Sequence, residues 1–147
     1  MSDQPMFKSA GDASVDHVTL LLIPNFSMLA FTSVVEPMRL ANMIAGKTLY
    51  KWSVISRDGE PAPASNGINV AVSAAATDVE RPQNVIVCSG IDAHIYQDAL
   101  TFGWLRRWAR EGSHVGAVCT GAHILAHAGL LNGYRCTLHW ANLDSFV

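Results

Sequence analysis

Cys119 is the residue whose surroundings most suggest covalent chemistry. It follows a short apolar run, Val115–Val118, and Gly121 lies just behind it. A strand that turns sharply into a helix exposes the side chain at the corner, in the geometry known as a nucleophile elbow. The free N–H groups at the start of the helix favour a thiolate there. The alternative is that Cys119 is a small apolar core residue, as free cysteines commonly are, and the spacing alone leaves both interpretations open.

A catalytic cysteine also needs a base, and the candidates are His123, His127 and His139. His123 and His127 are spaced i, i+4, so they share one helix face and could ligate a metal ion. The segment lacks the glutamate of the zinc-protease motif and offers no evident third ligand. We therefore expect no metal, and the simpler interpretation is a half-exposed helix face. His139 lies at the end of the last predicted strand, beside Trp140.

Several polar and aromatic residues directly follow apolar runs that are typical of strands. In a parallel sheet the carboxyl ends of the strands line the ligand crevice. We therefore expect a set of such residues to converge and to form the ligand-binding site. These residues are Asn25, Phe26, Gly90, Ile91, Cys119, Thr120, His139 and Trp140. This convergence predicts a pocket, and it does not by itself predict catalysis.

The strands that must position these residues are indicated by runs that are apolar at nearly every position. Such runs suit strands buried on both faces, as in a parallel sheet covered by helices. The runs are Val18–Ile23, Tyr50–Ser56, Asn84–Cys88 and Val115–Val118. A short strand at Ile68–Val72 and one more beginning at Arg135–Leu138 are also expected. With the helices between them, these strands predict a three-layer, doubly wound α/β domain with a mostly parallel, flavodoxin-like sheet.

Helices are predicted between these strands. The first begins at Ser33, which has capping-box spacing, or near Ser27 with a kink at Pro37, and ends at Gly46. Apolar residues stepping by three or four from Ile95 predict a second helix, which closes at residues 111–112. A third, apolar helix follows Cys119 and extends to residue 128.

Length and composition limit the class of protein. The chain of 147 residues is about the length of one domain, and its 50% hydrophobic and 15% charged content excludes a disordered protein. A net charge of −2 offers no footprint for nucleic acid or an anionic membrane. The three cysteines are an odd number without CxxC spacing, which argues against a disulfide framework. Residues 1–16 read as a mobile leader without signal-peptide features, so a cytoplasmic protein is expected.

Seven segments together resemble the DJ-1/PfpI superfamily, also described as class I glutamine amidotransferase-like. More narrowly, the chain is similar to the N-terminal ligand-sensing domain of AraC-type transcriptional regulators of the GlxA-like group. The segments are Ile23–Phe26, Glu36–Asn42, Val87–Asp92, Trp104–Arg107, Gly116–Ala122, Ala128–Gly133 and Thr137–Trp140. The resemblance implies that residues 17–147 form a sensing domain, incomplete at its C-terminus and without the helix-turn-helix region that contacts DNA.

The same resemblance implies a sensor in preference to an enzyme. Enzymes of the superfamily pair the elbow cysteine with an acid from the first βα segment, where our alignment places Ala30. The protease-like branch has a histidine directly after the cysteine, where this chain has Thr120. Cys119 and His139 match residues of the family, but this chain has no acid at the position of the family's activating acid. No catalysis is therefore expected. The alternatives are a Cys-dependent hydrolase, hydratase or glyoxalase-like enzyme, or a thiol redox sensor.

The resemblance further implies a homodimer and a small-molecule effector. We expect no cofactor, and the net charge and the short apolar runs lead us to expect no membrane partner. Effectors of similar regulators include amino acids and quaternary amines such as betaine or carnitine. Phe26 and Trp140 are expected to offer aromatic faces to a quaternary ammonium group. The helix Gln97–Arg110 carries several aromatic residues, so Trp104 is expected to be partly exposed and is a candidate dimer contact.

Overall fold

The apolar runs of the sequence form one parallel sheet in the computed structural model, which describes residues 14–146. Its strands are β1 (Asp16–Leu22), β2 (Tyr50–Ser56), β5 (Ala74–Ala75), β6 (Asn84–Cys88) and β7 (His114–Val118). They are arranged in the order β5-β2-β1-β6-β7, and every pair is parallel. The predicted leader lies largely outside the described residues, and β1 begins at Asp16.

The central strand β1 is buried on both of its faces. Leu20 and Leu22 point into one core layer, whereas Leu21 and Ile23 point into the other, and all are at most 2% exposed. Side chains alternate between the two faces of a strand, so a strand covered on both sides must be apolar at consecutive positions. This confirms the interpretation of the continuous apolar runs.

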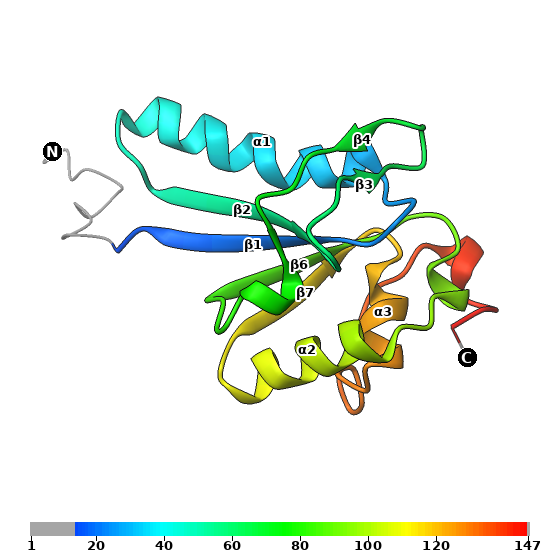
Figure 1. Ribbon diagram of the computed structural model, residues 1–147. Coiled ribbons are helices and arrows are strands. Elements are labelled where there is room, and N and C mark those ends of the chain that lie inside the picture. Colours follow the sequence, from blue (N-terminus) through cyan, green and yellow to red (C-terminus); the bar gives the residue numbers. More distant parts are fainter. Residues whose placement is uncertain (1–13, 147) are drawn as a thin grey trace, which may run out of the picture.

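Helices cover both faces of the sheet. Helix α1 (Met28–Ala45) lies on one face, and α2 (Ala99–Arg110) and α3 (Gly121–His127) lie on the other (Figure 1). The antiparallel pair β3 (Ala62–Pro63) and β4 (Asn69–Val70) lies near the beginning of α1. The predicted three-layer α/β architecture is therefore confirmed.

Helix α1 begins at the earlier of its two predicted positions. The Ser27 hydroxyl oxygen accepts a hydrogen bond from the N–H of Ala30 at 3.3 Å and caps the helix. Ser33 does not cap, because it lies inside the helix and its hydroxyl donates to the Ala30 carbonyl at 2.7 Å. The helix continues through Pro37 and ends at Gly46, whose φ of 62° is the left-handed conformation expected of a helix C-terminus.

The segment predicted as one helix from Ile95 is divided in two. A short 3₁₀ helix, η2 (Ala93–Ile95), is separated from α2 by an extended stretch. Helix α2 begins at Ala99 because Asp98 caps it, its carboxylate accepting a hydrogen bond from the N–H of Thr101 at 3.1 Å. Another 3₁₀ helix, η1 (Ala76–Asp78), directly follows β5.

Two predicted strands differ in the structure. The strand at Ile68–Val72 is limited to Asn69–Val70, which pairs with β3. The prediction of a strand beginning at Arg135–Leu138 is wrong, because residues 134–139 form no regular element and residues 134–137 are exposed. The chain then forms a 3₁₀ helix, η3 (Trp140–Asn142). Within residues 14–146, no helix has the length and apolar character needed to cross a lipid bilayer.

Candidate functional site

Cys119 occupies the sharp corner between β7 and α3. The strand ends at Val118 and the helix begins at Gly121, two residues after the cysteine. The backbone φ of Cys119 is 57°, a left-handed conformation that is uncommon for a residue with a side chain. Cys119 is also exposed. The elbow geometry is confirmed, and the interpretation of Cys119 as a buried core residue is wrong.

Two glycines allow the backbone segments around this corner to approach one another. A Cβ atom on Gly121 would lie 2.7 Å from the carbonyl oxygen of Val87, in the neighbouring strand β6. A Cβ atom on Gly90 would lie 2.3 Å from the carbonyl oxygen of Asn25, after β1. Both separations are shorter than van der Waals contact, so only glycine fits at either position.

Hydrogen bonds hold the carboxyl ends of the central strands together. The Thr120 hydroxyl donates to the carbonyl of Gly90 at 2.6 Å and links the cysteine corner to the loop after β6. In that loop, the N–H of Ile91 donates to the carbonyl of Asn25 at 3.1 Å, which ties the loop to the end of β1. The convergence of strand ends predicted from the sequence is therefore present for β1, β6 and β7.

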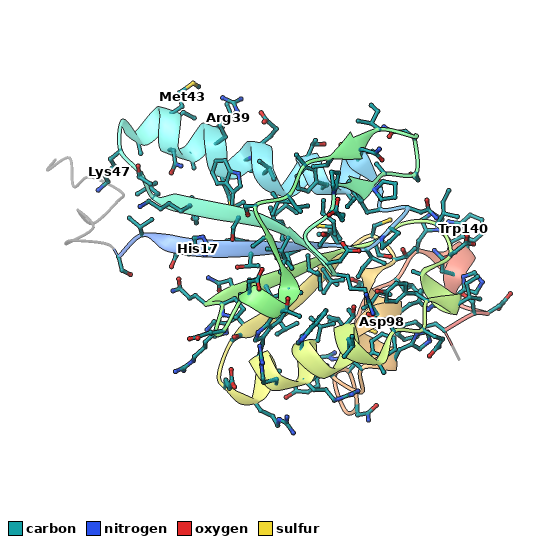
Figure 2. The ribbon with its side chains drawn as sticks, in the orientation of Figure 1. His17, Arg39, Met43, Lys47, Asp98 and Trp140 are labelled. Carbon is teal, nitrogen blue, oxygen red and sulfur yellow. The ribbon has the colours of Figure 1, made fainter. Side chains whose placement is uncertain are left out.

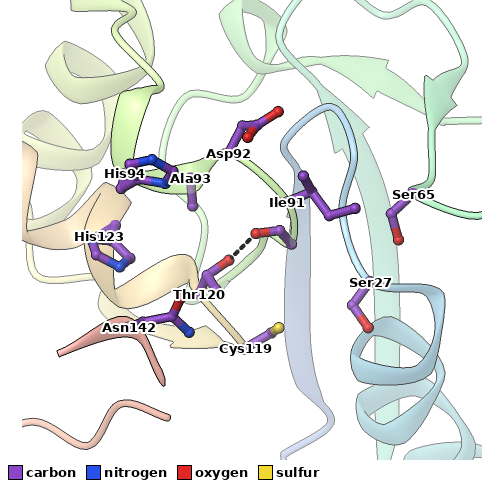
Figure 3. A pocket seen from close by; sticks show the side chains of 11 residues that line it. Ser27, Ser65, Ile91, Asp92, Ala93, His94, Cys119, Thr120, His123 and Asn142 are labelled. Carbon is purple, nitrogen blue, oxygen red and sulfur yellow. Dashed lines mark hydrogen bonds between the residues drawn. The ribbon is translucent and has the colours of Figure 1, made fainter. Parts of the chain in front are cut away.

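A pocket of about 510 Å³ opens between these loops. Its lining is polar and apolar in about equal parts and comes from the loops after β1, β3, β6 and β7, from α3 and from the C-terminal segment (Figure 3). The lining residues are Ser27, Ser65, Gly90, Ile91, Asp92, Ala93, His94, Cys119, Thr120, His123 and Asn142. The volume lies within the range of small-molecule sites.

Half of the predicted site residues line this pocket. The four that line it are Gly90, Ile91, Cys119 and Thr120. Asn25 does not, although its carbonyl and N–H groups hold neighbouring loops in place through Ile91 and Pro63.

The two aromatic residues expected at the site lie elsewhere. Phe26 is 0% exposed and packs in the core beneath α1, with its ring edge-on to Phe31 at 5.7 Å. Trp140 is 77% exposed and lies in the C-terminal segment without lining the pocket (Figure 2). The expected pair of aromatic faces is therefore not formed in this structure.

His139 also lies outside the pocket, for a local structural reason. The strand that was expected to carry it is not formed, so His139 instead precedes η3. Its Nδ1 atom accepts a hydrogen bond from the N–H of Ala141 at 3.2 Å and caps that short helix. The histidines that line the pocket are His123, from α3, and His94, from η2.

Sequence reasoning placed His123 on a half-exposed helix face, but the residue is 2% exposed. Its ring lies edge-on to the rings of His94 at 6.2 Å and Phe146 at 5.1 Å. A usable signal was its position in the first turn of the helix that directly follows Cys119, because this end of α3 lies at the cysteine corner. His94, Asp92 and Asn142 had no comparable signal, because they come from irregular segments.

Burial determines the protonation of two groups near the site. Desolvation lowers the pKa of His123, and the nearby His127 and His94 lower it further, so the imidazole is neutral at pH 7. Burial raises the pKa of the Cys88 thiol to about 12, with a smaller contribution from Cys119. Cys88 is therefore protonated and unreactive.

Among the residues that the structure describes, the lining contains a single carboxylate, that of Asp92, and no lysine or arginine. Within residues 14–146, no three His, Cys, Asp or Glu side chains gather in a way that could hold a metal ion. The pocket offers hydroxyl, amide, imidazole and thiol groups, which can bind a small polar molecule through hydrogen bonds.

A three-layer α/β domain with a cysteine elbow beside a polar pocket defines the class of this protein. The chain belongs to the DJ-1/PfpI family, which it matches over residues 17–146. It is 41% identical over 125 residues to the HTH-type transcriptional regulator GbdR of Pseudomonas aeruginosa. That match covers 84% of this chain and 34% of the regulator, so the chain spans about a third of its relative's length.

The fold is shared with proteins of more than one kind. An AraC family transcriptional regulator from Pseudomonas putida superimposes with a TM-score of 0.75 at 24% identity, covering 89% of this chain and 70% of that structure. The isonitrile hydratase of Pseudomonas putida is 30% identical over 128 residues, which cover 86% of this chain and 54% of the enzyme. The family thus includes both regulators and an enzyme.

Proposed function

We propose that the chain is the ligand-sensing and dimerisation domain of an AraC-type transcriptional regulator. The observation that carries the proposal is its 41% identity to a named transcriptional regulator over 84% of the chain. The pocket at the carboxyl edge of the sheet supplies a site for an effector. DNA would be contacted by another part of the regulator, because this chain has a net charge of −2 and no basic footprint.

The test is transcriptional. A fusion of residues 1–147 to an established helix-turn-helix DNA-binding domain should make a reporter gene respond to an effector, and pocket variants should remove the response. A fusion that binds its DNA but ignores every effector would argue against sensing. The variant Thr120→Val is suitable, since it removes the hydroxyl that donates to Gly90 while retaining the size of the side chain.

The effector proposed is a small polar metabolite, either an amino acid or a quaternary amine. The hydroxyl, amide and imidazole groups of the lining and the carboxylate of Asp92 favour such a molecule over an apolar one. Calorimetric titration with amino acids and betaines tests whether the effector belongs to this class. Because Trp140 lies outside the pocket, Trp140→Ala should leave the affinity unchanged, which reverses the expectation from the sequence.

Catalysis is the second candidate function, and the exposed cysteine at the elbow is the observation that favours it. Ala30 occupies the position where related enzymes have the activating acid, so we expect no turnover. Among the described lining residues, Asp92 is the one carboxylate. Purified protein should show no amidase, peptidase, hydratase or glyoxalase activity. An activity that is lost in Cys119→Ser, with the fold intact, would establish the enzyme instead.

We also propose that the domain forms a homodimer in which Trp104 takes part. Trp104 is half-buried and packs partly against the core, so some of its ring is available for contact. Sedimentation velocity at tens of micromolar, roughly the range of weak homodimers, should show a dimer that Trp104→Gln weakens. A monomer at all concentrations would contradict the proposal.

A further inference from the structure

We propose that residues 91–97 form a lid over His123, held in place by a latch at Asp98. The lid follows β6 and contains the short helix η2. Four consecutive residues at its start, 91–94, line the pocket (Figure 3). The purpose of the lid, which is to control access to an effector pocket, rests on the proposed function, but the lid itself is tested without an effector.

His123 is covered although it lines the pocket. It is only 2% exposed, and Ala93 of the lid is equally buried. The ring of His94, also in the lid, lies edge-on to that of His123 at 6.2 Å. Phe146 packs against the same ring at 5.1 Å. A molecule in the pocket therefore reaches the imidazole of His123 only when one of these covering segments moves.

The lid is attached to the rest of the chain mainly at its ends. At its start, the N–H of Ile91 donates to the carbonyl of Asn25 at 3.1 Å. Further along, the N–H groups of Ile95 and Tyr96 donate to carbonyls of the lid itself, at 3.1 and 3.3 Å. Ile91 and Ile95 are 59% and 63% exposed. A segment with local hydrogen bonds and exposed side chains can move as a unit while the core stays folded.

The carboxylate of Asp98 forms the latch at the other end of the lid. Its Oδ2 atom accepts hydrogen bonds from the hydroxyl of Thr101 at 2.6 Å and from Nε of Arg57 at 2.9 Å. The hydroxyl of Tyr96 lies 3.1 Å from the Thr101 hydroxyl and 3.5 Å from the Asp98 carboxylate. Because Arg57 directly follows β2, this network ties the lid to α2 and to the end of a sheet strand.

The latch is weak enough to open without unfolding of the domain. The side chains of Arg57 and Asp98 are 47% and 17% exposed, so water and salt screen their ion pair. A partly exposed ion pair and a single neutral hydrogen bond each change an equilibrium by about two- to tenfold. Loss of either one should therefore increase the population of the open lid by a factor of this size.

Diethyl pyrocarbonate, which modifies neutral imidazoles, measures how often His123 becomes accessible. The 147-residue chain is labelled to a low extent at about pH 7, where this imidazole is neutral, and its peptides are analysed by mass spectrometry. His114 is the internal reference, because it is exposed at the opposite end of β7 from the pocket. Cys88, which is 0% exposed in β6, reports global unfolding through its reaction with iodoacetamide. In the wild type, His123 should react more slowly than His114 but well before Cys88.

Two variants release the latch in different ways. Arg57→Gln removes the ion pair with Asp98. Tyr96→Phe removes one hydroxyl and keeps the ring, which lies edge-on to Phe102 at 6.1 Å. Each variant should speed the labelling of His123 about two- to tenfold relative to the wild type.

A matched control and a salt series test whether the latch itself is responsible. Arg39→Gln breaks another exposed ion pair, with Glu36 at 2.7 Å on α1, and should leave the labelling of His123 unchanged. Raising the salt from about 0.01 M to about 1 M shortens the Debye length from about 30 Å to about 3 Å. Salt should therefore speed the labelling of His123 in the wild type and have much less effect in Arg57→Gln.

The lid is refuted if neither latch variant changes the rate at which His123 is labelled, or if Arg39→Gln changes it equally. It is also refuted if wild-type His123 reacts as fast as His114, because nothing then covers it, or only together with Cys88.

Two further results separate this inference from the proposed function. A reporter fusion that responds to an effector, in a domain whose latch variants have no effect on His123, would refute the lid alone. A working latch in a domain whose fusion ignores every effector would refute the sensing function alone. If Arg57→Gln failed to fold, Tyr96→Phe and the salt series of the wild type would still decide.

Discussion

The backbone of Cys119 is the most demanding local feature of the site, because it places a residue with a side chain at a φ of 57°. A β-branched side chain is the least compatible with this conformation, whereas asparagine adopts it readily. We predict that Cys119→Val is less stable than Cys119→Asn by about 1 to 2 kcal/mol in urea denaturation. Equal stabilities would mean that the corner relaxes without cost.

His123 should make stability depend on pH. Its pKa in the folded protein lies below the ordinary value of 6.5, mainly because of burial. The unfolded chain therefore takes up this proton first as the pH falls, so the free energy of unfolding is fully retained above pH 6.5 and decreases below it. In the variant His123→Gln, this part of the decrease in the free energy of unfolding at low pH should be absent.

The comparison is made by urea denaturation at pH 7.5 and pH 5.5, values chosen on either side of the ordinary imidazole pKa of about 6.5. His114→Gln serves as the control, since His114 is an exposed histidine at the opposite end of β7 from the pocket. A wild-type protein that loses no more stability at low pH than His123→Gln would contradict the prediction.

At the scale of elements, glycines decide where segments pack closely. Gly90→Ala should destabilise the protein by about 1 to 3 kcal/mol, because its Cβ would overlap the carbonyl of Asn25. Gly103 is the matched control within α2, where a Cβ would meet nothing within 4 Å. Gly103→Ala should stabilise the helix by about 0.5 to 1 kcal/mol through its higher helix propensity. Thermal denaturation of both variants measures the contrast, and equal effects would contradict it.

Helix α1 illustrates why elements could be predicted and their ends could not. The apolar pattern and Gly46 predicted the helix and its end, but Ser27 and Ser33 were both suitable caps in the sequence. Only the fold distinguished them, because Ser27 is placed next to the loop after β6, where its N–H donates to the carbonyl of Ser89 at 3.2 Å.

At the scale of the whole molecule, the thiols report how the fold opens. Cys88 is 0% exposed in the interior strand β6 and its pKa is raised to about 12, while Cys119 and Cys136 are exposed. We predict that iodoacetamide modifies Cys119 and Cys136 in the native protein, and that Cys88 reacts only when the protein unfolds globally. Mass spectrometry of timed samples in increasing urea measures both rates. Early labelling of Cys88 would indicate that β6 opens locally.

The sequence by itself determined the layered architecture, because a strand buried on both faces must be apolar throughout, as Val18–Ile23 is. It also indicated the cysteine corner, since a strand, Cys119 and Gly121 follow one another directly along the chain, but it left open whether Cys119 is exposed. Both features depend on neighbouring residues, so local patterns are sufficient to predict them.

Only the tertiary structure decided which residues line the pocket. His123 and Asp92 are brought there by the packing of α3 and of the loop after β6, whereas Phe26 is directed into the core. Trp140 was expected beside Phe26 because a strand was predicted before it, but residues 134–139 pair with no strand. Contacts between segments far apart in sequence set these positions, and such contacts have no periodic signature along the chain.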